Sequence, residues 1–94
     1  PKLNVLLLGD EFNNILDNLP LTLEAITFGN NFSQPIDNLF PTSSYPSNLK
    51  IINFGLKFNQ SINLLPDSII GISIKNPNYN KQIIKLPENI KLTL

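Results

Sequence analysis

Several residue types that carry chemistry are absent from this chain of 94 residues, which contains no Cys, His, Arg, Met or Trp. Without Cys there is no disulfide, no thiolate nucleophile and no sulfur ligand for a metal. Without His the chain lacks the side chain that most often exchanges protons near neutral pH. Without Arg it lacks the planar group that grips carboxylates and phosphates through two hydrogen bonds. We therefore expect no enzymatic activity, no cofactor and no metal site.

An excess of one charge is also absent, because seven Lys offset seven Asp and Glu and the formal net charge at pH 7 is zero. This balance argues against a nucleic-acid binder or a polybasic membrane binder, and we expect a protein partner instead. The longest apolar run covers residues 5–8, far short of the roughly 20 needed to cross a bilayer. The chain opens with Pro and shows no signal peptide, so we expect part of a longer, cytoplasmic protein.

A pattern that recurs four times dominates what is present. Three copies begin at Leu3, Leu23 and Leu49 with an apolar residue at the first, fourth and sixth places, followed by Gly. A fourth copy begins at Ile69 and keeps the apolar frame without the Gly. Spacings of 20 to 26 residues between copies are typical of a stacked solenoid, in which each coil buries its apolar face against its neighbours.

The repeat predicts a single leucine-rich-repeat-like solenoid of about four coils, either α/β or mainly β, with a short parallel sheet. The coils are expected at residues 3–22, 23–48, 49–68 and 69–89, with the start of a fifth strand at 90–94. Strands should begin near the first apolar residue of each copy, and alternation should turn two side chains of each copy inward. The inward pairs are Leu6 and Leu8, Ile26 and Phe28, Ile52 and Phe54, and Ile72 and Ile74.

The segments between the strands repeat as well. The Gly after each of the first three strands is expected to form a corner with positive φ, which Gly adopts without a steric penalty. One aromatic residue in each copy predicts a stacked spine, and the residue after it predicts a polar column that bonds to the neighbouring coil. The spine consists of Phe12, Phe32, Phe58 and Tyr79, and the polar column of Asn13, Ser33, Asn59 and Asn80.

The return segments carry apolar residues three apart, a spacing that fits either a helical turn or an extended stretch. Pro at the end of three copies then stops any helix and directs the chain to the next strand. Between the second and third copies the phase slips by six residues at 40–46. We expect this insertion to form a loop outside the stack.

These residues resemble the FNIP repeat, a leucine-rich-like unit named for a Phe-Asn-Ile-Pro consensus. The best local match is Phe58-Asn59-Gln60-Ser61-Ile62 followed by Leu65-Pro66, and the second copy keeps Gln34-Pro35-Ile36. The resemblance implies a protein interaction or scaffold module. In that family such arrays often follow an F-box, which further implies the substrate-recognition part of an F-box type ubiquitin ligase adaptor. No F-box lies within these residues.

Two alternatives to an interaction module follow from the residues. Asp17 and Asp37 occupy equivalent places in adjacent coils, so their carboxylates would approach closely, as in some sugar-cleaving enzymes. A carbohydrate-active solenoid is therefore one alternative, although turn capping by Asp explains the same column. Asp10 and Glu11 beside Asn30 and Asn31 offer oxygen ligands for a weakly bound cation, but they lack the spacing of a calcium loop and we expect no metal site there. A structural component of a larger assembly is the other alternative.

The outward face of the sheet is the candidate partner face. Its side chains lie at the third and fifth places of each copy and are small and apolar toward the first coil. The candidate residues are Val5, Leu7, Ala25, Thr27, Ile51, Asn53 and Ser73. Val5 and Leu7 have two interpretations: they contact a partner protein, or a preceding segment of the chain covers them.

Overall fold

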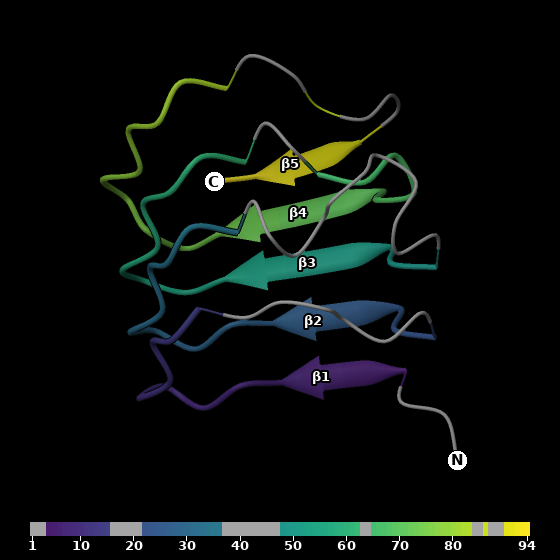
Figure 1. Cartoon of the computed structure of the whole chain (residues 1–94). Coiled ribbons are helices and arrows are strands. Elements are labelled where there is room, and N and C mark those ends of the chain that lie inside the picture. The colour runs from purple at the N-terminus through teal and green to yellow at the C-terminus, as the bar shows by residue number, and fades with distance from the viewer. Residues whose placement is uncertain (1–3, 16–21, 37–47, 63–64, 84–85, 87–89) are drawn as a thin grey trace.

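The structure is a computed structural model that describes residues 4–15, 22–36, 48–62, 65–83, 86 and 90–94. Five short strands follow one another along the chain and form one sheet in sequence order (Figure 1). They are β1 (Val5–Leu7), β2 (Ala25–Thr27), β3 (Ile51–Phe54), β4 (Gly71–Ile74) and β5 (Lys91–Thr93). All four pairings are parallel, so the prediction of a repeat solenoid with a short parallel sheet is confirmed.

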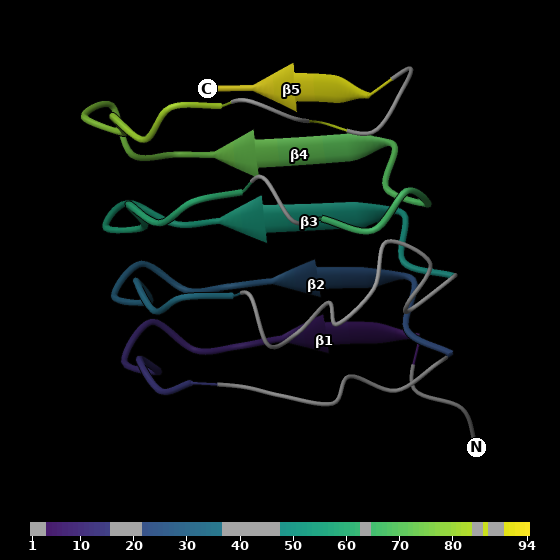
Figure 2. The same cartoon turned by 45° about the horizontal axis from the view of Figure 1, so that its top comes forward.

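The strands stack in the register that the repeat predicts. Leu6 pairs with Ile26, Ile26 with Ile52, Ile52 with Ile72, and Ile72 with Leu92. The pairing of β2 with β3 keeps this register although the copies they belong to are six residues further apart than the others. The insertion itself lies outside the described residues. Figure 2 shows the coils as successive layers, with the strands on one side of the stack.

The strands begin two residues later than the sequence predicts. At the entry to β2, the backbone N–H groups of Glu24 and Ala25 both donate to the carbonyl of Asn4, at 2.6 and 3.1 Å. The regular alternation of inward and outward residues starts only after these two N–H groups, which share one carbonyl acceptor. The first apolar residue of the copy nevertheless reaches the core, since Leu23, Leu49 and Ile69 are fully buried.

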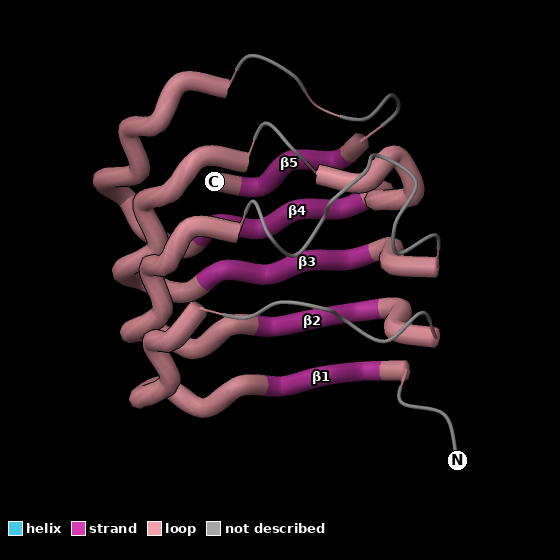
Figure 3. Tube along the Cα trace, viewed as in Figure 1, coloured by secondary structure: helices cyan, strands magenta, loops and turns pink. Residues whose placement is uncertain are grey.

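No helix occurs among the described residues, whose connecting segments are loops and turns (Figure 3). The described fold is therefore mainly β. The core contains the first apolar residue of the second, third and fourth copies, the inward column of the strands, two rings of the spine and aliphatic residues of the return segments. No polar side chain is buried among the described residues. The buried residues of the return segments are Ile36, Ile62 and Leu65.

The aromatic spine is confirmed. Phe12, Phe32, Phe58 and Tyr79 stack in sequence, with ring centroids 6.0, 6.2 and 6.1 Å apart and interplanar angles of 13° or less. Phe28 and Phe54 form a second, shorter stack at 5.3 Å. Each of these two rings also lies against the spine ring of its own coil, at 4.1 and 3.7 Å. Six rings thus form two adjoining columns in the core.

The predicted polar column bonds each coil to the next. The Asn13 Oδ1 accepts a hydrogen bond from the Ser33 N–H at 2.9 Å, and the Ser33 Oγ accepts one from the Asn59 N–H at 3.1 Å. The Asn59 Oδ1 then accepts one from the Asn80 N–H at 3.2 Å. The side chains therefore act as acceptors for the backbone of the following coil, which keeps the coils in register.

The corner glycines have a different role from the one predicted. None of them has a positive φ, so the expectation of a left-handed corner is wrong. Gly29 and Gly55 are needed because the coils approach closely: a Cβ on Gly55 would lie 2.6 Å from the Gly29 carbonyl oxygen and 2.7 Å from the Asn30 Cα. Gly29 would meet the backbone of Gly9 and Asp10 in the same way. The second and third copies thus require Gly because the preceding coil leaves no space for a side chain, whereas nothing lies within 4 Å of a Cβ on Gly9.

Candidate functional site

The outward side of the sheet carries the seven candidate residues on one face, because alternate residues of a strand point to opposite sides. Its first coil is the most open, with 53% of Val5 and 72% of Leu7 exposed. The other five residues are partly exposed, while the inward residues between them, such as Ile26 and Ile52, are buried. The placement of the candidate residues on one surface agrees with the sequence pattern.

The entry half of this face is apolar. The register aligns Val5, Ala25, Ile51 and Gly71 in one row across β1 to β4. The Ile51 side chain lies close to the bare backbone of Gly71, since a Cβ there would be 3.1 Å from the Ile51 Cδ1. The Ile51 side chain therefore lies in the middle of the apolar row and covers the backbone of Gly71.

The exit half of the face, toward the carboxyl ends of the strands, is polar on β2, β3 and β4. Leu7, Thr27, Asn53 and Ser73 form the second row, and the Asn53 Nδ2 donates a hydrogen bond to the Thr27 Oγ1 at 3.1 Å. This bond holds the Asn53 carboxamide across β2 and β3. The face therefore changes from aliphatic to hydrogen-bonding along β2 and β3, whereas both outward residues of β1 are aliphatic.

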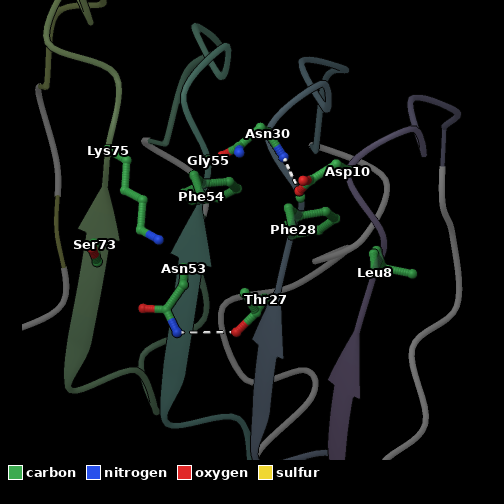
Figure 4. Close-up of a pocket in the computed structure, with 11 residues that line it drawn as sticks. Leu8, Asp10, Thr27, Phe28, Asn30, Asn53, Phe54, Gly55, Ser73 and Lys75 are labelled. Carbon is green, nitrogen blue, oxygen red and sulfur yellow. Dashed lines mark hydrogen bonds between the residues drawn. The ribbon is translucent and has the colours of Figure 1, made fainter.

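A groove of about 320 Å³ extends from the polar row to the corners of the coils, as Figure 4 shows. Its charged residues are Asp10 and Lys75, on the first and fourth coils, and Asn30 lies at the corner between them. Polar residues of the face make up one side of the groove and corner residues the other. Its lining consists of Leu8, Asp10, Thr27, Phe28, Gly29, Asn30, Asn53, Phe54, Gly55, Ser73 and Lys75.

The corner wall of the groove is fixed by bonds between coils. The Asp10 Oδ1 accepts a hydrogen bond from the Asn30 N–H at 3.1 Å, and the Asn30 Oδ1 accepts one from the Leu56 N–H at 3.2 Å. Asp10 and Asn30 thus perform the same stacking role in successive coils. This hydrogen bond gives Asp10 a structural role, and among the described residues no three His, Cys, Asp or Glu side chains form a group that could hold a metal ion.

The corner of the fourth coil is built from Asn76 in place of Gly. Its Oδ1 accepts a hydrogen bond from the Asn78 N–H at 2.8 Å, and its Nδ2 donates to the Phe58 carbonyl at 3.1 Å. The first bond closes a local turn and the second attaches that turn to the third coil. The place held by Gly in the other copies is that of Lys75, the residue before Asn76, and its side chain extends into the groove (Figure 4).

The groove was not among the sequence predictions, although the pattern contained a signal for it. The residue at Gly9, Gly29, Gly55 or Lys75 follows the outward residues by two places, so strand alternation continues to the same face. Lys75 is the one long side chain at this place. Asp17 and Asp37 lie outside the described residues, and the hypothesis of a carbohydrate-active site stays a hypothesis.

None of the described residues belongs to a helix with the length and hydrophobicity of a membrane span.

The chain was compared with protein families and with curated proteins. No family model matches the chain. A protein of Dictyostelium discoideum described as FNIP repeat-containing is 38% identical over 66 residues, which are 68% of this chain and 12% of that relative.

Proposed function

Because the chain is built from FNIP repeats, we propose that it is a non-catalytic interaction module whose outward sheet face binds a protein partner. The observation that carries the proposal is the exposed aliphatic surface of the first coil, where 53% of Val5 and 72% of Leu7 are accessible on the same face of β1. Exposed apolar area of this kind gains free energy when a partner removes it from water. Ala25 and Ile51 continue this surface across the next two strands.

The shape of the molecule supports the same function. A solenoid presents an extended surface with rigid, evenly spaced side chains, which suits the recognition of another macromolecule. Apolar contacts at the centre and hydrogen-bonding groups at the edge are the usual arrangement of a protein interface. Here the apolar row ends beside Thr27, Asn53 and Ser73. The proposed face therefore has both parts.

A photo-crosslinking amino acid in place of Leu7 tests this function directly in cells that make the protein. The same replacement at Ile15 is the control, since that aliphatic side chain is also exposed, at 61%, in the same coil but outside the sheet. We expect protein adducts from position 7 and few from position 15. Equal adduct formation at both positions would contradict the proposed face.

Ile51→Asp sharpens the same test, because a charge at the centre of the face would be buried without a counter-charge in the complex. We expect adducts at position 7 to fall by more than tenfold while the melting temperature changes little. Ile70→Asp is the control, since Ile70 is an exposed Ile just before β4. Unchanged adduct formation in Ile51→Asp would place the partner elsewhere.

A finer proposal concerns the protein to which these coils belong. The matched part covers only 12% of the Dictyostelium relative, so the array has room for further domains in such a protein. We propose that the face recognises substrates for an F-box type ubiquitin ligase. The full-length sequence tests this, because an F-box upstream of the coils supports the adaptor role and its absence contradicts it. Co-precipitation with a cullin-type ligase core is the corresponding measurement.

A further inference from the structure

The groove at the exit edge of the sheet is polar at both walls and oppositely charged at its two ends. Asp10 occupies the first coil and Lys75 the fourth, and both are exposed. In the part of the chain that the structure describes, no ion pair involves either residue. The negative charge of Asp10 and the positive charge of Lys75 are therefore available to a bound molecule.

The distance between these charges is set by the stacking of the coils. Adjacent parallel strands lie about 4.8 Å apart, so the backbones of the first and fourth coils are about 14 Å apart. The Lys75 side chain extends from the end of β4 toward Asn53 on β3, which shortens the gap between the charged groups (Figure 4). An extended peptide rises about 3.3 Å per residue, so three or four residues span the gap.

The groove also offers hydrogen-bonding groups along this path. Asn53 uses its Nδ2 for Thr27, which leaves its Oδ1 on the side of the groove, and the Ser73 hydroxyl lies on the next strand. A volume of about 320 Å³ falls at the lower end of the range of about 300–1,000 Å³ that is usual for ligand sites. A short stretch of extended chain fits these dimensions.

We propose that the groove binds an extended segment of the partner protein that places Lys or Arg beside Asp10 and Asp or Glu three or four residues away, beside Lys75. The proposal rests on the proposed function and adds the chemistry of the partner. The opposite charges at the two ends of the groove are complementary to such a segment, and the groove is continuous with the candidate face because Thr27, Asn53 and Ser73 belong to both. A partner that covers the candidate face therefore also reaches the groove.

The two charges select the partner more than they tighten the complex. Exposed ion pairs contribute little, so removal of one charge should weaken binding by about twofold to fivefold. Charge complementarity acts mainly on partner choice and association rate. We therefore expect the affinity to fall as the salt concentration rises, and to fall less steeply when one of the two charges is removed.

Selection from a displayed library of random dodecapeptides tests the proposal without knowledge of the natural partner. The wild-type chain should enrich peptides with a basic and an acidic residue three or four places apart. Lys75→Glu should enrich peptides that carry a basic residue at both places. Lys57→Glu is the control, because Lys57 is exposed in the corner of the third coil and does not line the groove.

Asp10→Asn tests the other end while it keeps the hydrogen-bond acceptor that holds Asn30. Asn30 itself shows that an amide oxygen can perform this stacking role. The selected peptides should lose their preference for a basic residue and keep the acidic one. Glu11→Gln is the control, since Glu11 is exposed next to Asp10 and lies outside the groove lining.

The outcomes distinguish peptide binding in the groove from partner binding on the candidate face. Peptides whose charges follow the variants as described support the proposal, and an Ile51→Asp chain that no longer binds them supports the proposed function as well. Peptides that depend on Ile51 but are indifferent to Lys75 and Asp10 overturn the groove proposal alone. A selection without enriched peptides also overturns it, while the crosslinking experiment at position 7 still decides the function of the face.

Discussion

The inner and outer coils carry the same aromatic position, yet they bury it differently. Phe32 and Phe58 are 1% and 0% exposed, whereas Phe12 and Tyr79 are only partly buried. The inner rings have a stacked neighbour on each side, and Phe28 or Phe54 from their own coil lies against them. The first and fourth coils have Leu8 and Ile74 in place of that second ring.

This comparison shows where the stability of a solenoid arises. Each coil gains most of its burial from the coils on either side, so the unfolding free energy is approximately a sum of nearest-neighbour terms. The repeat places a second ring only in the second and third coils, whose spine rings have a stacked ring on both sides. The inner coils therefore form the rigid part of the molecule and hold the two strands at the centre of the candidate face.

Loss of an inner spine ring should have the largest effect on stability. We expect Phe58→Ala to lower the unfolding free energy by about 3–5 kcal/mol, because it removes a fully buried ring that stacks on three others. Phe12→Ala should cost about 1–2 kcal/mol, since that ring is partly exposed and stacks on one neighbour. Urea denaturation of both variants measures the difference. Equal losses would contradict the comparison.

The corner glycines give a second pair of matched substitutions. Gly55→Ala places a Cβ 2.6 Å from the Gly29 carbonyl oxygen, so the coils must separate and we expect a loss of about 1–3 kcal/mol. Gly9→Ala has nothing within 4 Å of the new Cβ and should be neutral or stabilise by up to about 1 kcal/mol. Thermal unfolding distinguishes the two. A comparable loss in both would mean that backbone conformation matters more than space.

The polar column predicts a smaller effect. Asn59→Ala leaves the Asn80 N–H without its acceptor and should cost about 1 kcal/mol. Asn80→Ala should cost less, because no described residue donates a hydrogen bond to the Asn80 side chain. Chemical denaturation of the two variants provides the comparison. A larger loss in Asn80→Ala would show that a following coil bonds to it.

The smallest effect concerns the pH dependence of the outer ring. Burial raises the pKa of Tyr79 above 10.0, and its hydroxyl donates a hydrogen bond to the Gln60 carbonyl at 2.8 Å. The unfolded chain therefore loses this proton at lower pH than the folded chain. The stability that Tyr79 contributes is complete below its unfolded pKa and is lost as the pH rises through its folded pKa.

Tyr79→Phe isolates this term from the titration of Lys side chains, which both proteins share. Between about pH 9 and about pH 11, the unfolding free energy of the wild-type chain should fall more steeply than that of the variant. Urea denaturation at several pH values measures both slopes. Identical slopes would mean that Tyr79 titrates alike in the folded and unfolded chains.

The sequence predicts most of the stack because the repeat and the strand period act together. Alternation around Ile26 and Ile52 identifies the inward column, and the spacing of the copies identifies which residues pair. The aromatic and polar columns follow from the same alignment. The function of the face has a weaker basis in sequence, since outward residues show composition without the identity of a partner.

The groove and the role of Gly depend on distances that a sequence pattern does not contain. Gly55 looks the same in sequence whether it supplies a positive φ or a gap for the adjoining coil, and only the position of Gly29 distinguishes these. Lys75 similarly reaches the groove because it takes the place of the Gly and strand alternation turns it to the outward side, while Asn76 forms the turn that follows. The fourth copy, which has Lys75 in place of Gly, thus supplies the positive charge at one end of the groove.

Hydrogen exchange at the backbone amides tests the difference between inner and outer coils most directly. Exchange reports the free energy of local opening, which should be highest where a coil has neighbours on both sides. We predict the slowest exchange in β2 and β3, which belong to the inner coils, intermediate exchange in β4, and the fastest in β1 and β5, which have one neighbouring strand each. Equal protection of all five strands would contradict the account, because it would mean that the sheet opens as a single unit irrespective of the number of neighbours.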